Sequence, residues 1–374
     1  MRGSRIRPIA IAAGGTGGHV YPALATAAAL AERGERVVLL TDRRTAERYP
    51  SAFSGIETHV IAGEGLAGRG AAKVPGAIAS FALGAVQARS LLVRLAPAAI
   101  LAFGGYPSVA PAVAARSLPA GLRPRVVLHE QNAVLGRANR VLARFADLLA
   151  LSFADTARVP TKTRTALIGN PVRPAVAALS NAPYDPPEGG QTVRLLVLGG
   201  SQGARVFAQL VPAALALLPQ ALCSRLVLTM QCRAEDTPRA EASLSALGIA
   251  VWLAPFFDNI ASLYAAAHLV LGRAGASTVA ELACVGRPAI LIPYPHAVDD
   301  HQSANARALA LAGAAEVFSE AELTPAQLAG RLAALLGEPG RLSAMGAAAR
   351  RLARPEAARE LAEAVLALAQ TEAR

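Results

Sequence analysis

The fold is decided by the stretch PIAIAAGGTGGH at residues 8–19 and by its counterpart VRLLVLGGSQGA at residues 193–204. In each, a short apolar run leads directly into a glycine-rich segment. A run of this kind is typical of a buried parallel strand followed by a strand-to-helix turn. After the first glycine segment, an Ala- and Leu-rich helical pattern continues to about Arg33, and Gly34 closes it. The two stretches therefore predict two halves that each begin with a strand, a glycine loop and a helix.

The rest of the chain repeats this alternation of strands and helices. Further strands are expected at 36–41, 98–103, 126–129 and 148–152, and then at 225–230, 250–253, 269–271 and 289–292. A turn-rich linker, SNAPYDPPEGGQ, occupies residues 180–191. The pattern predicts an α/β protein with two Rossmann-like, doubly wound parallel-sheet domains facing a central cleft. We place the domains at 1–172 and 173–354, with a C-terminal helix at about 355–374 that completes the first.

Composition narrows the class of protein. The chain has 374 residues, of which 53% are hydrophobic and 17% charged, so disorder is excluded. No apolar stretch is long enough to span a membrane. The net charge of +11 suggests a partner rich in phosphate, although enrichment in Arg and Ala also arises from a GC-rich genome. Aromatic residues make up only 4%, and no Lys-rich segment is present, which disfavours a nucleic-acid-binding module.

The positive charge is concentrated in one region. Residues 66–145 contain ten basic residues and a single acid, Glu130. Apolar runs at 77–86 and 91–93 lie in the same region. Apolar side chains beside basic ones are what contact with an anionic membrane surface requires. We expect such contact through residues 66–94; the alternative is a core-facing helix with a solvated basic face.

The glycine loops indicate an anionic ligand. Glycine lets a ligand approach the main chain, and the N–H groups of the following helix favour phosphate. Neither loop matches the G-x-G-x-x-G dinucleotide fingerprint, and neither has the Lys-Ser/Thr ending of a P-loop. Three cysteines without metal-ligand spacing, and a start without signal-peptide features, favour the cytoplasm.

An ordered set of motifs makes the chain's resemblance specific. The motifs are GGTGGH at 14–19 with Pro22, GGYPS at 104–108, HEQN at 129–132 with Gly136 and Asn139, GNPVR at 169–173, GGSQGA at 199–204, RAGAST at 273–278 with Glu281, PYP at 293–295, and DHQ at 300–302 with Asn305. This set resembles the peptidoglycan N-acetylglucosaminyltransferases, a family of GT-B glycosyltransferases.

The resemblance implies a reaction. N-acetylglucosamine would pass from UDP-N-acetylglucosamine to the muramoyl 4-hydroxyl of undecaprenyl-diphosphate-muramoyl-pentapeptide, with inversion, converting lipid I to lipid II in cell-wall synthesis. The first domain would then hold the acceptor and face the membrane, and the second would hold the donor. The protein would be peripheral at the cytoplasmic membrane face, where other cell-wall synthesis proteins could be partners.

The resemblance also assigns residues. Those expected to bind UDP-N-acetylglucosamine are Thr16, Gly17, Gly18, Asn132, Arg173, Ser201, Gln202, Phe257, Ala276, Ser277, Thr278, Glu281 and Gln302. Those expected to bind the acceptor are Gly14, Gly15 and Tyr106, and the 14–19 loop could serve donor, acceptor or both.

Two residues are candidates for the general base. His19 suits the task because an imidazole titrates near neutral pH. Glu130 is the rival, and it could instead position His19 or a sugar hydroxyl. We expect no metal site and no cofactor, since Asp299 and Asp300 are adjacent and do not form a spaced D-x-D motif.

Other activities stay open at this point. The alternatives within enzymes are another GT-B transferase, such as one that makes glycosyl diacylglycerols, or a UDP-N-acetylglucosamine epimerase. A nicotinamide-dependent dehydrogenase is disfavoured by the spacing of the glycines.

Overall fold

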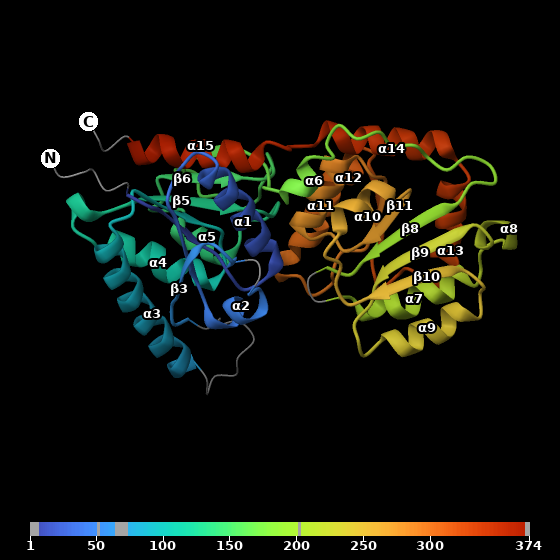
Figure 1. The fold of residues 1–374 in the computed structure, drawn as a ribbon, viewed down its shortest axis with the longest axis horizontal. Coiled ribbons are helices and arrows are strands. Elements are labelled where there is room, and N and C mark those ends of the chain that lie inside the picture. Colours follow the sequence, from blue (N-terminus) through green and yellow to red (C-terminus); the bar gives the residue numbers. More distant parts are fainter. Residues whose placement is uncertain (1–6, 51–52, 64–73, 201–202, 371–374) are drawn as a thin grey trace. The chain divides into compact units, whose positions relative to one another are not determined.

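The computed structural model describes residues 7–50, 53–63, 74–200 and 203–370, and for 74–79 the backbone alone. The chain divides into two compact units. Unit 1 comprises Met1–Arg173 and Glu356–Arg374, and unit 2 comprises Pro174–Pro355. Each unit is a parallel sheet with helices packed on it (Figure 1). The predicted fold class, α/β with two doubly wound parallel sheets, is confirmed.

Unit 1 is built on a seven-stranded sheet with the order β3-β2-β1-β4-β5-β6-β7, in which every pair is parallel. Its strands are β1 (Ile9–Ala12), β2 (Val37–Thr41), β3 (Glu57–Val60), β4 (Ala99–Ala102), β5 (Arg125–Glu130), β6 (Leu148–Leu151) and β7 (Thr165–Leu167). The central strands β1 and β4 are buried along their whole length, as expected for a sheet covered on both faces.

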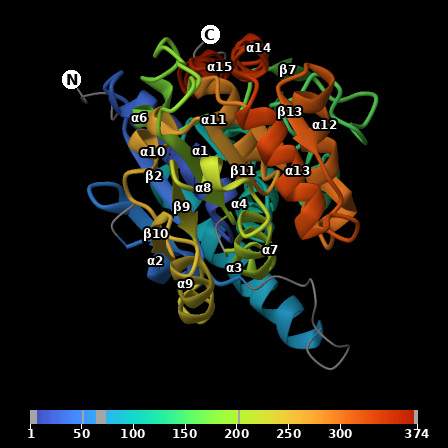
Figure 2. The same cartoon turned by 90° about the vertical axis from the view of Figure 1, so that its right-hand side faces the viewer.

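Two helical layers cover this sheet. Its helices are α1 (Gly17–Ala31), α2 (Arg43–Arg48), α3 (Val74–Leu95), α4 (Tyr106–Arg116), η3 (Ala120–Leu122), α5 (Arg137–Leu142) and α15 (Ala357–Gln370). Apolar residues of α1 and α15 share one core cluster on one face, and those of α3, α4 and α5 share another on the opposite face. In both views α3 extends beyond the sheet of its own unit at its N-terminal end (Figures 1 and 2).

Unit 2 is built on a six-stranded parallel sheet with the order β10-β9-β8-β11-β12-β13. Its strands are β8 (Val193–Leu198), β9 (Leu226–Gln231), β10 (Ala250–Ala254), β11 (Leu269–Gly272), β12 (Ala289–Leu291) and β13 (Ala315–Val317). Its helices are α6 (Pro174–Ala177), α7 (Arg205–Leu215), α8 (Gln220–Cys223), α9 (Thr237–Ser245), α10 (Ile260–Ala266), α11 (Ala276–Val285), η4 (Val298–Asp300), α12 (His301–Leu311), α13 (Pro325–Leu336) and α14 (Pro339–Arg351).

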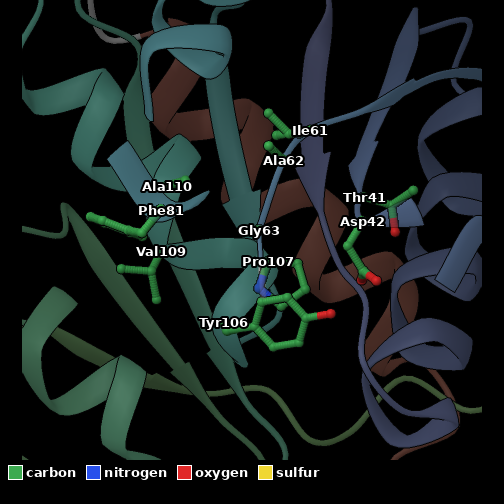
Figure 3. A pocket seen from close by; sticks show the side chains of 10 residues that line it. All are labelled: Thr41, Asp42, Ile61, Ala62, Gly63, Phe81, Tyr106, Pro107, Val109 and Ala110. Carbon is green, nitrogen blue, oxygen red and sulfur yellow. The ribbon is translucent and has the colours of Figure 1, made fainter. Parts of the chain in front are cut away.

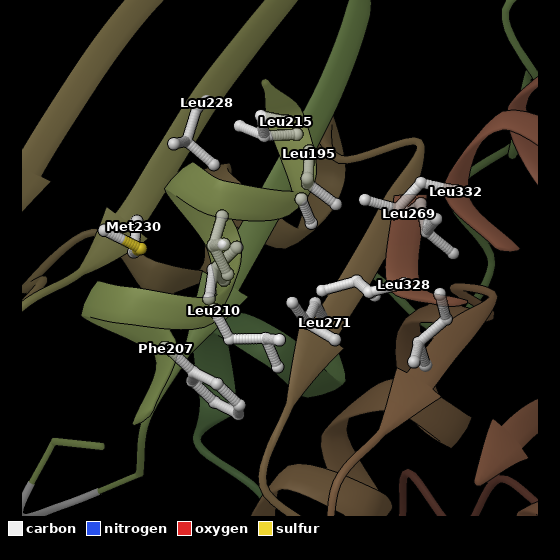
Figure 4. Close-up of a cluster of buried hydrophobic side chains, with 14 of the residues drawn as sticks. Leu195, Phe207, Leu210, Leu215, Leu228, Met230, Leu269, Leu271, Leu328 and Leu332 are labelled. Carbon is white, nitrogen blue, oxygen red and sulfur yellow. The ribbon is translucent and has the colours of Figure 1, made fainter. Parts of the chain in front are cut away.

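The core of unit 2 lies between this sheet and the helices α7 and α13. Phe207 of α7 and Leu332 of α13 pack with Leu195, Leu228 and Leu271 of the sheet, and all five are fully buried or nearly so (Figure 4). Burying side chains of this size stabilises the fold by about 1.5–3 kcal/mol each. The loops at the carboxyl ends of these strands are therefore attached to a well-packed core.

Candidate functional site

The first group of candidate residues lies at the carboxyl edge of the unit 1 sheet. Strands β1, β4 and β5 are parallel neighbours, so the loops that follow them emerge at the same edge. Strand β1 pairs with both β2 and β4, which makes this the point where the strand order reverses. Ligands of doubly wound sheets bind in the crevice at such a point. His19, Tyr106 and Glu130 all lie there, at the ends of these loops or strands.

The glycine loop after β1 leaves the start of α1 open. Gly15 has a φ of +87°, a conformation that favours glycine, and its N–H donates to Thr45 Oγ1 at 2.8 Å. Thr16 is the N-cap of α1 and makes no side-chain capping bond within the described chain. Gly17 and Gly18 then begin the helix without side chains over its terminal N–H groups. This end of α1 can therefore approach an anion closely.

His19 lies in the first turn of α1. Its Nδ1 is 3.2 Å from Thr16 Oγ1. The imidazole lies beside the loop between β4 and α4: a β-carbon built at Gly105 would be in ordinary van der Waals contact with His19 Cε1, at 3.5 Å. When Nδ1 donates its hydrogen to Thr16, Nε2 carries the lone pair. The arrangement can hold His19 as a proton acceptor.

Glu130 ends β5 and is only 2% exposed. Its Oε1 accepts hydrogen bonds from the Asn132 backbone N–H and side-chain Nδ2, both at 3.1 Å. Its Oε2 accepts from the Gly136 N–H and from Asn139 Nδ2, both at 2.9 Å. Four donors thus occupy a carboxylate that has about four lone-pair sites. Glu130 is used in shaping the loop from 131 to 136 and in orienting Asn132.

His129, next to Glu130, points to the other side of the strand and is fully buried. Its Nε2 donates to the Gly169 carbonyl at 2.9 Å, and Gln131 Nε2 donates to its Nδ1 at 3.0 Å. Burial lowers the pKa of His129 to about 4, an effect that nearby His19 increases and the Gly169 bond opposes. A neutral imidazole therefore joins β5 to residue 169 of the GNPVR segment. This role was not predicted, because nothing in the sequence distinguishes a buried histidine from a catalytic one.

Arg173 closes unit 1 at the end of the same segment. Its guanidinium carbon lies 5.0 Å from the centre of the Tyr21 ring of α1, within cation–π range. Arg173 is thereby drawn to the helix that carries His19.

The second group of candidates lies at the carboxyl edge of the unit 2 sheet. Helix α11 follows β11 and begins at Ala276, after the N-cap Gly275, which offers no side-chain cap. Ser277 Oγ is buried and has no hydrogen-bond partner among the described residues. A buried hydroxyl without a partner is costly, so its presence at an uncapped helix start fits a polar ligand that completes it. Ala276, Ser277 and Thr278 are the predicted residues of this turn.

Glu281 lies one turn further along α11 and is 3% exposed. It accepts a hydrogen bond from Tyr264 Oη of α10 at 3.2 Å. Tyr264 is itself buried, so the bond fixes the carboxylate from the side of the protein. Sequence reasoning missed Tyr264, because nothing in a separate helix marks it as the partner of Glu281.

Gln302 lies in the first turn of α12, after β12. Its Oε1 accepts from the Tyr294 N–H at 2.9 Å, and its amide nitrogen is the group that can donate to a ligand. Arg273 holds the segment before Tyr294, because its Nη1 donates to the carbonyls of Ile292 at 3.1 Å and Pro293 at 3.2 Å. Arg273 also forms an ion pair with Glu320. Its structural role was not predicted from the sequence.

Phe257 lies in the loop after β10 and is 5% exposed. Its ring packs edge-on against the Trp252 ring, with the two ring centres 4.9 Å apart, so this packing fixes the backbone of the loop. The remaining predicted donor residues, Ser201 and Gln202, lie outside the described residues.

Two kinds of feature are absent from the described residues. Among them, no group of three or more His, Cys, Asp or Glu side chains could hold a metal ion. No helix in the described ranges is long and apolar enough to cross a membrane.

The chain is similar to known proteins over nearly its whole length. It is 52% identical over 362 residues to a UDP-N-acetylglucosamine--N-acetylmuramyl-(pentapeptide) pyrophosphoryl-undecaprenol N-acetylglucosamine transferase of Granulibacter bethesdensis, covering 96% of this chain and 93% of the relative. It is 52% identical over 366 residues to the protein of the same name from Acidiphilium cryptum, covering 98% of each.

Solved structures and family models agree with this similarity. The crystal structure of Acinetobacter baumannii MurG matches with a TM-score of 0.76 at 28% identity, covering 96% of this chain and 99% of that one. The model of the glycosyltransferase family 28 N-terminal domain matches residues 9–150, and that of the C-terminal domain matches residues 194–362. Since these models account for most of both units, the chain belongs to glycosyltransferase family 28.

Proposed function

We propose that this protein transfers N-acetylglucosamine from UDP-N-acetylglucosamine to the muramoyl 4-hydroxyl of undecaprenyl-diphosphate-muramoyl-pentapeptide, which converts lipid I to lipid II. The near full-length similarity to relatives named for this transfer carries the proposal. The two helix starts at the carboxyl edges of the sheets add support, since both substrates contain a diphosphate.

The donor is held mainly by unit 2. The start of α11, with the unpartnered Ser277 hydroxyl, suits the phosphate of UDP. Glu281 accepts hydrogen bonds from the ribose hydroxyls, and the amide nitrogen of Gln302 donates to a sugar hydroxyl. The Phe257 backbone reads the uracil edge. Thr16, Gly17, Gly18, Asn132, Arg173, Ser201 and Gln202 remain predicted donor contacts.

The acceptor is activated by unit 1. His19 Nε2 takes the proton of the 4-hydroxyl as that oxygen attacks the anomeric carbon of the donor. The bond from this carbon to the diphosphate breaks on the opposite face, UDP leaves with the electron pair, and the configuration inverts. We assign the base to His19 because four donors already occupy the Glu130 carboxylate. Glu130 instead positions Asn132, while Gly14, Gly15 and Tyr106 contact the acceptor.

The experiment that tests this function compares acceptors. Purified protein with UDP-N-acetylglucosamine should glycosylate a polyprenyl-diphosphate muramoyl peptide and leave diacylglycerol unmodified. Mass spectrometry of the products distinguishes the outcomes. Transfer to diacylglycerol alone, or release of free N-acetylmannosamine, would replace the proposal with a different transferase or an epimerase.

The protein works at the cytoplasmic face of the membrane, and α3 is the docking element we propose. Its side chains Leu83, Val86 and Val93 are 53%, 66% and 49% exposed. Arg94 is exposed beside them, and Arg89 is exposed but also donates to the Ser117 carbonyl at 2.7 Å. Apolar and basic side chains on one protruding helix match the needs of an anionic surface. Lys73, part of the predicted docking region, lies outside the described residues.

Vesicle binding tests this docking element. Replacing Lys73, Arg89 and Arg94 with Gln should weaken binding to phosphatidylglycerol-containing vesicles. Replacing Arg89 also removes its hydrogen bond to the Ser117 carbonyl. The double variant Arg94→Gln with Leu83→Ser tests membrane docking with this bond intact. Arg359→Gln, on α15 of the opposite layer, is the charge-matched control. Equal binding by all variants would contradict the proposal.

A further inference from the structure

A cavity of about 210 Å³ opens in unit 1 between the ends of β2 and β3 and the helices α3 and α4. Figure 3 shows its lining, which is apolar on one side and carries oxygen atoms on the other. The lining residues are Thr41, Asp42, Ile61, Ala62, Gly63, Phe81, Tyr106, Pro107, Val109 and Ala110. An apolar cavity of about 150 Å³ already takes up benzene, so this one has room for a branched hydrocarbon segment.

The polar end of the cavity adjoins the glycine loop of the acceptor site. A β-carbon added at Gly14 would lie 2.5 Å from Asp42 Oδ2 and 2.9 Å from Pro107 Cγ. One added at Gly15 would lie 3.9 Å from the Tyr106 ring. Asp42, Tyr106 and Pro107 therefore belong to both the cavity wall and the surroundings of the loop. If a ligand binds the glycine loop through an anionic group, the atoms attached to that group lie at the polar end of the cavity.

The charge of Asp42 is already used within the protein. Its carboxylate accepts from the Thr45 N–H at 3.1 Å and from Thr45 Oγ1 at 2.5 Å, and it caps α2. Away from this end, the walls are formed by the side chains of Ile61, Phe81 and Val109 (Figure 3). Apart from Asp42, the described lining residues carry no charge, so this part of the cavity suits hydrocarbon.

We propose that this cavity binds the isoprenoid carbons next to the diphosphate of the acceptor. The inference rests on the proposed function, in which Gly14, Gly15 and Tyr106 contact the acceptor, and it places the acceptor diphosphate at Gly14 and Gly15. In a polyprenyl diphosphate the anionic group and the branched hydrocarbon are joined directly, which matches the direct contact between loop and cavity. Phe81 belongs to α3, the proposed docking helix, so the chain enters from the side that faces the membrane.

Two water-soluble acceptors test this inference. Both carry the muramoyl peptide diphosphate; one is esterified with methyl and the other with a short two-isoprene group. For the unaltered protein, the KM for the prenyl acceptor should be about tenfold to a hundredfold lower, as expected when a group the size of a leucine side chain is buried. Equal KM values with normal turnover would overturn the cavity inference alone. No transfer to either acceptor would overturn the proposed function and this inference with it.

Variants that fill the cavity sharpen the test. Ala110→Leu places a larger side chain in the lining, and Val109→Phe does the same at a less buried position if Ala110→Leu folds poorly. In either variant the advantage of the prenyl acceptor should shrink to about threefold or less, with the methyl acceptor turned over as before. Ala82→Leu, at an exposed position of α3 outside the lining, is the matched control and should keep the full advantage. A filled cavity that leaves the advantage intact would contradict the proposal.

Discussion

At the scale of single residues, surroundings decide which of two candidate bases can act. His19 and Glu130 both belong to motifs that the sequence singles out, and the sequence favours His19 because an imidazole titrates near neutral pH. The Glu130 carboxylate is buried and receives four hydrogen bonds, whereas His19 contacts Thr16 Oγ1 through Nδ1. The two candidate bases could therefore be predicted from the sequence. The hydrogen bonds that separate their roles could not, because residues 132, 136 and 139 reach Glu130 only in the folded loop.

The buried His129 gives a prediction for stability at low pH. Its pKa is about 4 in the folded protein and near 6.5 when unfolded, so the unfolded chain binds more protons between these values. Stability from this group is complete above about pH 6.5 and is lost as the pH falls toward 4. When the pH falls from 6.5 to 5, the free energy of unfolding should decrease by about 2 kcal/mol because of this group.

Urea unfolding at several pH values measures this effect. In the His129→Gln variant, which cannot titrate at this position, the free energy of unfolding should decrease less over the same pH range, by about 2 kcal/mol. An identical slope in the two proteins would show that His129 is not held neutral.

At the scale of elements, the loop between β12 and α12 depends on Arg273. This side chain binds the Ile292 and Pro293 carbonyls, and the next residue, Tyr294, binds Gln302. The guanidinium also lies 5.1 Å from the Phe207 ring and 5.5 Å from the Tyr294 ring, over the unit 2 core. Arg273 therefore links the core to Gln302, and we propose that it positions this donor contact.

Loss of this support should weaken donor binding. We expect Arg273→Gln to raise the KM for UDP-N-acetylglucosamine about tenfold, since hydrogen bonds to a charged group contribute about 1.5–3 kcal/mol, with a smaller change in kcat. Arg273→Lys should recover part of the loss. Arg307→Gln, an exposed position of α12, is the charge-matched control.

A double substitution separates positioning from general destabilisation. If Arg273 acts through Gln302, then adding Gln302→Ala to Arg273→Gln should raise KM little further. Fully additive effects would contradict the link.

The elements also show what the sequence could and could not predict. Strands such as β1, β4 and β11 are buried on both faces, and their apolar runs predicted them. Strands β3, β7 and β13 were missed; each is the outermost strand of its sheet and is three or four residues long. Strand β3 has no buried residue and β7 is largely exposed, so neither carries an apolar run.

At the scale of the whole molecule, the last helix belongs to the first unit. Helix α15 packs on α1, and Leu361, Ala362 and Val365 are fully buried in the cluster that includes β1. The chain thus crosses between units twice, near residues 173 and 356. The helix that carries His19, α1, is therefore held in place partly by α15, the last helix of the chain.

Removing one buried side chain of α15 should destabilise unit 1. Leu361→Ala is expected to cost about 2–5 kcal/mol, because it leaves a cavity in a fully packed core. Leu352→Ala, at a position 41% exposed, is the matched control and should change stability by about 0.5 kcal/mol or less. Urea unfolding followed by circular dichroism measures both. Equal stability of the two variants would contradict the packing of α15 described above.

We propose a division of labour in which unit 2 binds the donor and His19 of unit 1 activates the acceptor. The most direct measurement is a comparison of UDP affinity and kcat in His19→Ala and Glu281→Ala. His19→Ala should lower kcat about 100-fold or more and keep UDP affinity, as for loss of a general base. Glu281→Ala should weaken UDP binding about tenfold or more, since a charged acceptor is lost. If both variants changed affinity and kcat to the same extent, the division of labour would be wrong.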